Sequence, residues 1–187
     1  MEIEKLGREY QLEVDWRPFF LRPDTPPEGR PLPAHVRERM KDPNEPLKKR
    51  AEREGLTIVR SEIVPSTRRA HEAAEFARTH GALGPMHAAL LRRYWTEGQD
   101  LFAMETLRGA AEEARLDPDE LQRAIEAGTH RAAVEAAVRE ADELGIHAVP
   151  TFIFDGRLAV QGAQELPVFR SAMERLGATP LAPAGDS

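Results

Sequence analysis

Cysteine is absent from the 187 residues of this chain. A disulfide framework, a thiolate metal site and a thiol nucleophile all require that side chain. The printed chain can build none of the three. Thiol chemistry by this chain is therefore excluded before any motif is considered.

Long apolar runs and a basic face are missing as well. No stretch approaches the roughly 20 apolar residues that cross a bilayer, and the first residues lack the layout of a signal peptide. The formal net charge is −6, and the longest basic cluster, Lys48–Arg50, is followed closely by acidic residues. General nucleic-acid binding needs a concentrated basic face. We therefore expect a cytoplasmic protein with neither a nucleic-acid nor a membrane partner.

Metal-ligand and phosphate-binding patterns are absent too. No two histidines stand at the i, i+4 spacing of helical metal ligands, and His71 lacks the second histidine of a zinc-protease motif. Glycine-rich phosphate loops and a Gly-x-Ser-x-Gly elbow do not occur. We expect no metal and no bound cofactor. The six histidines are His35, His71, His80, His87, His130 and His147.

The most informative stretch runs from Leu144 to Gln164. A helix with apolar residues at helical spacing ends at Gly145, because glycine readily adopts the left-handed conformation that closes a helix. Residues Thr151–Phe154 are β-branched and aromatic, Asp-Gly follows, and Leu158–Val160 supplies a return strand. This order predicts a β-hairpin.

Pro150 stands at the entrance to that hairpin, preceded by Val149. Proline cannot donate a hydrogen bond to a strand ladder, so sheet pairing alone does not determine its position. His147 lies three residues earlier and is either an exposed loop residue or a group that would tune a nearby thiolate. The absence of any thiolate favours the first interpretation.

The N-terminal part predicts a short helix followed by a half-buried strand, Leu12–Trp16, in which apolar and charged residues alternate. Eight prolines lie between Pro18 and Pro46, so regular structure is not expected before about Ala34. One or two short charged helices should follow, up to Glu54.

Residues 66–128 read as a block of four helices. Ser66 or Thr67 can cap the first, Gly84-Pro85 opens the second, and Asp117 can cap the fourth with Pro118 in its first turn. A further helix begins near Thr129 and runs to Gly145.

The order of helix, Gly145-Ile-His-Ala-Val-Pro-Thr-Phe, hairpin, Gly162-Ala-Gln and amphipathic helix resembles the C-terminal half of a thioredoxin-fold protein. Within that superfamily the chain resembles the DsbA family, in particular its FrnE-like branch. Further phrases shared with that branch are Trp16-Arg-Pro-Phe, Ala70-His-Glu-Ala, Leu90-Leu-Arg-Arg-Tyr-Trp-Thr-Glu-Gly-Gln-Asp and Leu116-Asp-Pro-Asp.

The resemblance implies an α/β fold, a thioredoxin-like sheet with an inserted all-helical subdomain as in DsbA. Residues 1–65 would form the N-terminal part of the thioredoxin-like domain with a proline-rich loop, and residues 66–128 the helical insert. Residues 129–177 would complete the thioredoxin-like domain. Residues 178–187 would be a flexible tail, since chain ends are often poorly ordered.

The resemblance also implies a cis Val149–Pro150 bond and a substrate-binding loop made of His147, Val149 and Pro150. Val149 would present its backbone to an extended peptide, which could pair with it as an added strand. The alternative is a rigid turn that only starts the hairpin. No catalytic residue is predicted, because the family's cysteine pair does not occur in this chain.

In the resembling family, a strand and the Cys-x-x-Cys turn precede the first residues found here. We expect a chain truncated at its N-terminus, whose sheet lacks a central first strand. Each buried unpaired backbone group along such a gap costs roughly 1–3 kcal/mol. Self-association through the gap is one expected consequence.

Three functions remain open. The first is a DsbA-like, FrnE-like thiol–disulfide oxidoreductase homologue that, as printed, cannot exchange disulfides. The second is a non-redox module that binds an extended peptide or protein. The third is a relative of 2-hydroxychromene-2-carboxylate isomerase and kappa-class glutathione transferases, for which glutathione would be the cofactor.

Overall fold

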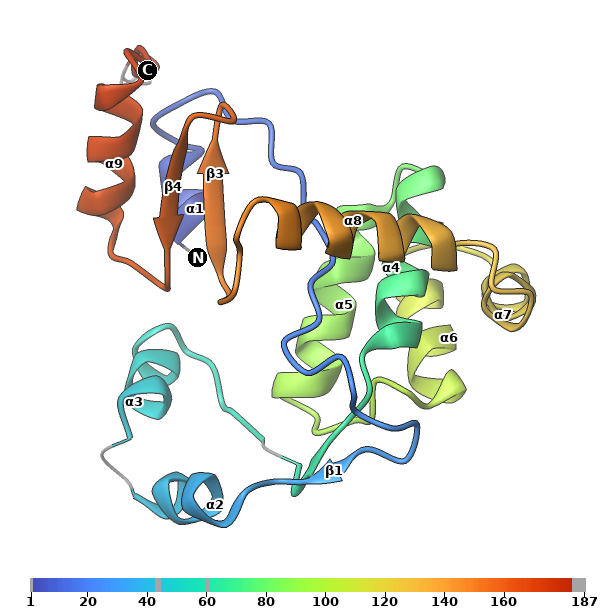
Figure 1. Ribbon diagram of the computed structural model, residues 1–187. Helices are drawn as coiled ribbons and strands as arrows, with labels where there is room; N and C mark the ends of the chain where they lie inside the picture. Colours follow the sequence, from blue (N-terminus) through green and yellow to red (C-terminus); the bar gives the residue numbers. More distant parts are fainter. Residues whose placement is uncertain (1, 43–44, 60, 183–187) are drawn as a thin grey trace, which may run out of the picture. The chain divides into compact units, whose positions relative to one another are not determined.

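The computed structural model describes residues 2–42, 45–59 and 61–182 (Figure 1). These residues form nine helices and four short strands, which pair into two two-stranded sheets. Backbone contacts divide the chain into two units. Unit 1 comprises residues 1–21 and 139–187, and unit 2 comprises residues 22–138.

Unit 1 is built on an antiparallel hairpin between β3 (Thr151–Phe154) and β4 (Leu158–Gln161). Thr151 lies opposite Gln161, and Phe154 lies opposite Leu158. The turn places Asp155 at φ 52° and Gly156 at φ 62°, the left-handed conformation for which Asp-Gly is favoured. The hairpin predicted from the sequence is confirmed.

Two helices supply the core of unit 1, α1 (Glu2–Leu6) and α9 (Leu166–Arg175). Because strand side chains alternate between faces, Phe152 and Phe154 pack towards Phe169 of α9, with ring centroids 4.9 and 6.2 Å away. Ile153 lies on the opposite face of β3 and is 43% exposed. The four buried residues of this core are Leu6, Tyr10, Phe169 and Met173.

The strand predicted at Leu12–Trp16 is wrong. These residues form no strand in the structure, and Val14 is 47% exposed. A β-strand needs a neighbour to accept and donate its backbone hydrogen bonds, and no strand among the described residues pairs with this segment. Leu12 nevertheless packs against the core of unit 1.

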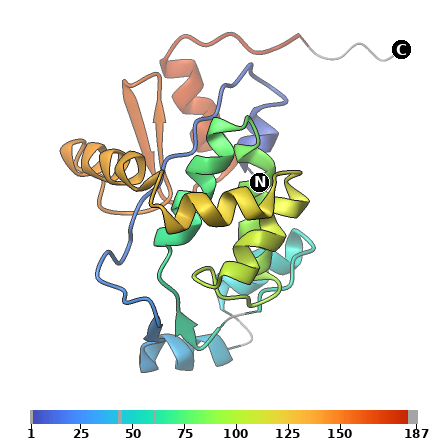
Figure 2. The same cartoon turned by 90° about the vertical axis from the view of Figure 1, so that its right-hand side faces the viewer.

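Unit 2 contains the predicted helical block, which the structure confirms as α4 (Arg68–Thr79), α5 (Leu83–Trp95), α6 (Met104–Glu113) and α7 (Pro118–Glu126). Figures 1 and 2 show these helices packed together, in green to yellow. Asp117 caps α7 by accepting hydrogen bonds from the backbone N–H groups of Asp119 and Glu120, at 2.8 and 3.1 Å. Helix α8 (Arg131–Glu143) follows and ends in unit 1.

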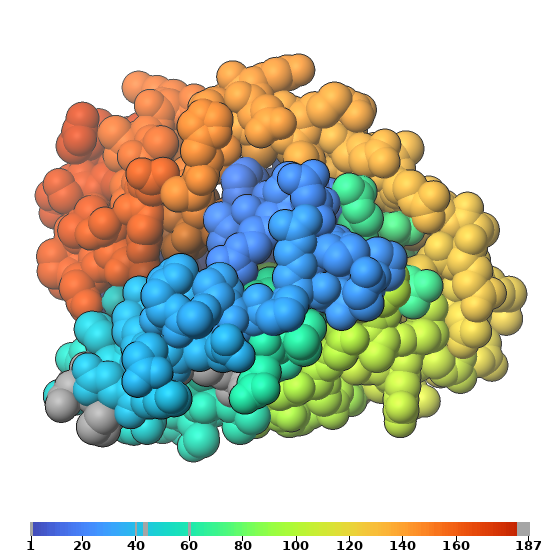
Figure 3. Space-filling model, turned by 60° about the horizontal axis from the view of Figure 1, so that its bottom comes forward, coloured from blue at the N-terminus to red at the C-terminus, as the bar shows by residue number. Residues whose placement is uncertain are grey.

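The proline-rich segment differs from the expectation that regular structure begins only near Ala34. A short strand, β1 (Arg30–Pro31), pairs with β2 (Ile63–Val64). Proline is accommodated because β1 is an edge strand of only two residues. The predicted charged helices are α2 (Ala34–Lys41) and α3 (Pro46–Arg53), which lie on the surface drawn in Figure 3.

Backbone contacts group the described part of residues 22–64 with the helical block. The proposed domain boundaries at 65, 128 and 177 stay predictions. The second half of the proposed tail, residues 183–187, lies outside the described residues. In the first half, the Leu181 N–H donates a 2.7 Å hydrogen bond to the Glu9 carbonyl. Among the described helices, none combines the length and apolar character needed to cross a membrane.

Candidate functional site

The candidate site is the loop between α8 and β3. Gly145 adopts φ 67° and closes α8. The N–H of Gly145 donates to the Asp142 carbonyl, and the N–H of Ile146 donates to the Ala141 carbonyl, at 3.0 and 2.9 Å. These bonds satisfy carbonyls that a helix end leaves open, so the chain leaves α8 in a defined direction.

The Val149–Pro150 peptide bond is cis in the structure, the isomer that the family resemblance implies. Two hydrogen bonds hold this dipeptide in place. The Pro150 carbonyl accepts one from the Gly162 N–H at 2.8 Å, and the Ala148 carbonyl accepts one from the Thr151 hydroxyl at 2.7 Å. These bonds tie the loop to the first residue of β3 and to the residue that follows β4.

The three predicted site residues, His147, Val149 and Pro150, lie on this one loop, and all three are exposed. Val149 leaves 47% of its surface exposed, although it is apolar. His147 makes no hydrogen bond, ion pair or ring contact with any described residue. The loop therefore presents one apolar side chain and one imidazole to a binding partner.

The free edge of β3 continues from this loop. In an antiparallel pair, alternate residues direct their N–H and C=O groups towards the partner strand and away from it. The Pro150 carbonyl accepts a hydrogen bond from the Gly162 N–H across the pair. The backbone N–H and C=O groups of Phe152 and Phe154 are therefore also directed towards β4, and those of Thr151 and Ile153 are directed outward. Within the described part of the chain, no strand pairs with this outer edge.

The loop offers backbone hydrogen-bonding groups and an apolar side chain. The chain contains no thiol, and the site residues include no carboxylate. Among the described residues, no cluster of three histidine, aspartate or glutamate side chains could hold a metal ion. Outward N–H and C=O groups beside an apolar side chain are what strand addition by an extended peptide requires.

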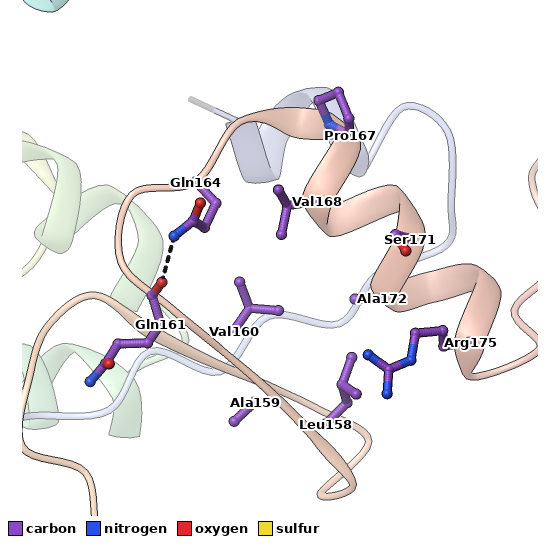
Figure 4. A pocket seen from close by; sticks show the side chains of 10 residues that line it. All are labelled: Leu158, Ala159, Val160, Gln161, Gln164, Pro167, Val168, Ser171, Ala172 and Arg175. Carbon is purple, nitrogen blue, oxygen red and sulfur yellow. Dashed lines mark hydrogen bonds between the residues drawn. The ribbon is translucent and has the colours of Figure 1, made fainter.

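Sequence reasoning missed a hollow of about 620 Å³ between β4 and α9 (Figure 4). Its lining includes Val160, Gln161, Gln164, Val168 and Arg175. The sequence gives a partial indication of this hollow, because apolar and polar residues of β4 and of the first turns of α9 are close to one another along the chain. Only the packing of the helix against the hairpin creates the hollow.

Most of the chain is similar to known proteins. The sequence profile described as DSBA-like thioredoxin domain matches residues 1–174. The protein YwbO of Bacillus subtilis (strain 168) is 29% identical over 165 residues, which cover 87% of this chain and 81% of YwbO.

Two solved structures are similar. A structure described as a probable DsbA oxidoreductase from Streptomyces coelicolor has a TM-score of 0.77 and 26% identity, with 89% of this chain and 76% of that chain covered. A 2-hydroxychromene-2-carboxylate isomerase has a TM-score of 0.73 at 19% identity, with 94% and 86% covered. At that identity, the second similarity concerns the fold alone.

Proposed function

The chain belongs to the DSBA-like thioredoxin domain family, and from that membership we propose that it binds extended segments of other proteins at the Val149–Pro150 loop and the free edge of β3. It is then a homologue of DsbA-like, FrnE-like thiol–disulfide oxidoreductases. Because the printed chain has no cysteine, the proposed activity of this chain is binding.

The observation that carries this proposal is the exposure of Val149 next to unpaired backbone groups. Val149 is 47% exposed, and the outward groups of Thr151 and Ile153 follow it along β3. An extended peptide would satisfy those groups with its own backbone and cover the valine side chain. Main-chain bonding of this kind accepts many peptide sequences.

A titration with an unfolded protein tests the proposal. Carboxymethylated ribonuclease A is a suitable probe, because its blocked cysteines exclude disulfide exchange. We expect saturable binding by the wild-type chain in isothermal titration calorimetry. Val149→Asp should weaken it roughly tenfold, since burying a valine side chain contributes about 1.5 kcal/mol and a buried unpaired carboxylate opposes binding.

Val59→Asp is the matched control, because Val59 is a similarly exposed valine, at 43%, in unit 2. It should bind the probe as the wild type does. Equal affinities for wild type and Val149→Asp, or no binding by the wild type, would contradict the proposal. Thermal unfolding of each variant checks that the fold is intact.

A further inference from the structure

The hollow between β4 and α9 lies on the opposite edge of the hairpin from β3. Figure 4 shows Val160 and Val168 facing each other across it, with Gln161 and Gln164 at one end and Arg175 beside Leu158 at the other. Its volume of about 620 Å³ lies within the range of ligand-binding clefts. The hollow is therefore large enough for a short peptide segment.

The outer edge of β4 offers hydrogen-bonding groups to this hollow. The backbone groups of Leu158, Val160 and Gly162 are directed towards β3. Because these directions alternate along an antiparallel strand, the N–H and C=O groups of Ala159 and the N–H of Gln161 are directed outward. The Gln161 carbonyl already accepts a 2.9 Å hydrogen bond from the Gln164 amide (Figure 4). Three backbone groups remain for a third strand.

The wall formed by α9 carries apolar residues, Pro167, Val168 and Ala172, with Ser171 among them. Val168 is 41% exposed although it points into the hollow, and Ala172 is buried beneath it. Every second side chain of an added strand would face α9. An apolar side chain at such a position would cover Val168 and exclude water from both residues.

Arg175 marks one end of the hollow with positive charge. Its guanidinium makes no ion pair or hydrogen bond with any described residue, and it lies at the end where β4 begins. A carboxylate is the complementary group, because guanidinium and carboxylate form charge-assisted, often bidentate hydrogen bonds.

We propose that this groove binds an extended apolar peptide as a third strand, antiparallel to β4, with a carboxylate placed on Arg175. Antiparallel pairing brings the C-terminal end of the peptide to Leu158 and therefore to Arg175. At about 3.4 Å per residue, the four residues of β4 match a segment of similar length. This site is separate from the Val149–Pro150 loop and does not depend on it.

Fluorescence anisotropy with a labelled probe tests the proposal on the full chain. The probe is fluorescein-labelled Gly-Ser-Val-Thr-Val with a free C-terminal carboxylate. We expect saturable binding that Val168→Lys, Ala159→Pro and Arg175→Gln each weaken about fivefold or more. Ala159→Pro removes an outward N–H, and proline is tolerated on that side of an edge strand.

Two comparison peptides identify the source of the carboxylate. The same peptide as a C-terminal amide should bind about fivefold more weakly to the wild type, and Arg175→Gln should bind both forms equally. An amidated peptide ending in glutamate should recover the lost affinity if a side-chain carboxylate serves as well. If Ala159→Pro does not fold, a peptide N-methylated at the amide facing β4 supplies the same test.

Arg139→Gln is the matched control, because Arg139 is an exposed arginine on α8 without a partner among the described residues. It should leave binding unchanged. The loss of affinity caused by Arg175→Gln should be the same with and without Val149→Asp, which distinguishes this groove from the proposed loop site. No binding of the probe at millimolar concentration, or equal binding by Arg175→Gln and the wild type, would overturn the proposal. A concentration-dependent dimer without peptide binding would assign the groove to a second copy and also overturn it.

Discussion

Glu9 and Arg170 join the turn after α1 to helix α9, although 161 residues separate them in the sequence. The guanidinium donates two hydrogen bonds of 2.6 Å to the carboxylate. The pKa of the Glu9 carboxyl is lowered below its ordinary 4.5, chiefly by these hydrogen bonds and further by the positive charge of Arg170. A single exposed pair thus links distant parts of unit 1.

We expect the replacement of Glu9 by glutamine to change how the free energy of unfolding depends on pH. A carboxyl whose pKa is depressed on folding stabilises the protein above its unfolded pKa, and this stabilisation is lost as the pH falls through the folded pKa. The difference in the free energy of unfolding between wild type and Glu9→Gln should therefore be constant above about pH 5.5 and shrink towards pH 3. Urea unfolding at several pH values measures it.

Glu143→Gln is the control for that series, because Glu143 is exposed and has no partner among the described residues. The same replacement there should change stability little at every pH. A Glu9→Gln difference that stays constant down to pH 3 would show that the pair does not couple protonation to folding.

At the scale of elements, the short β1–β2 pair depends on Gly29. This residue adopts φ 77°, and a Cβ atom there would lie 2.5 Å from the Ile63 side chain and 2.8 Å from the Val64 carbonyl oxygen. Gly29→Ala should lower the free energy of unfolding by about 2 kcal/mol or more, since the left-handed conformation alone costs roughly 1–2 kcal/mol. Urea unfolding measures the loss.

Gly55→Ala separates the two causes of that loss. Gly55 has a similar φ of 73°, but nothing lies within 4 Å of the position of its missing Cβ. We expect Gly55→Ala to lose only the conformational part, so Gly29→Ala should be the more destabilising. Equal losses would mean that the contacts with β2 relax freely.

The two strand pairs, β3–β4 and β1–β2, show how much of the structure the sequence predicts. The β3–β4 hairpin was predictable because Asp155-Gly156 fits its turn and β-branched, aromatic and aliphatic residues flank it. The Leu12–Trp16 segment alternates apolar and charged residues, but alternation does not supply the partner that a strand needs. The pairing of Arg30–Pro31 with Ile63–Val64 joins segments more than 30 residues apart, and two residues are too few to carry a periodic pattern.

The candidate site depended on more than local sequence. Pro150 marks the entrance of a hairpin locally, but the assignment of Pro150, Val149 and His147 to a substrate-binding loop came from the resemblance to the DsbA family and stays a prediction. The groove between β4 and α9 was not predictable, because it depends on how Val168 and Arg175 of a later helix face the hairpin. Sequence spacing alone does not determine that packing.

At the scale of the whole molecule, both proposed binding surfaces lie in unit 1. Unit 1 contains the loop of Val149 and Pro150 and the two hairpin edges with which no other described strand pairs, while unit 2 contains the helical block. The similarity to a DSBA-like thioredoxin domain spans both units. In the proposed function, this chain binds extended protein segments along β3 without thiol chemistry.

Amide hydrogen exchange followed by NMR tests this claim most directly, with carboxymethylated ribonuclease A as the added protein. In the free chain the amides of Thr151 and Ile153 face outward, whereas those of Phe152 and Phe154 face β4. A saturating concentration of the probe should slow amide exchange at Thr151 and Ile153 and leave exchange at Phe152 unchanged. Unchanged exchange at both outward amides, or slowing confined to Ala159 and Gln161 on β4, would contradict it.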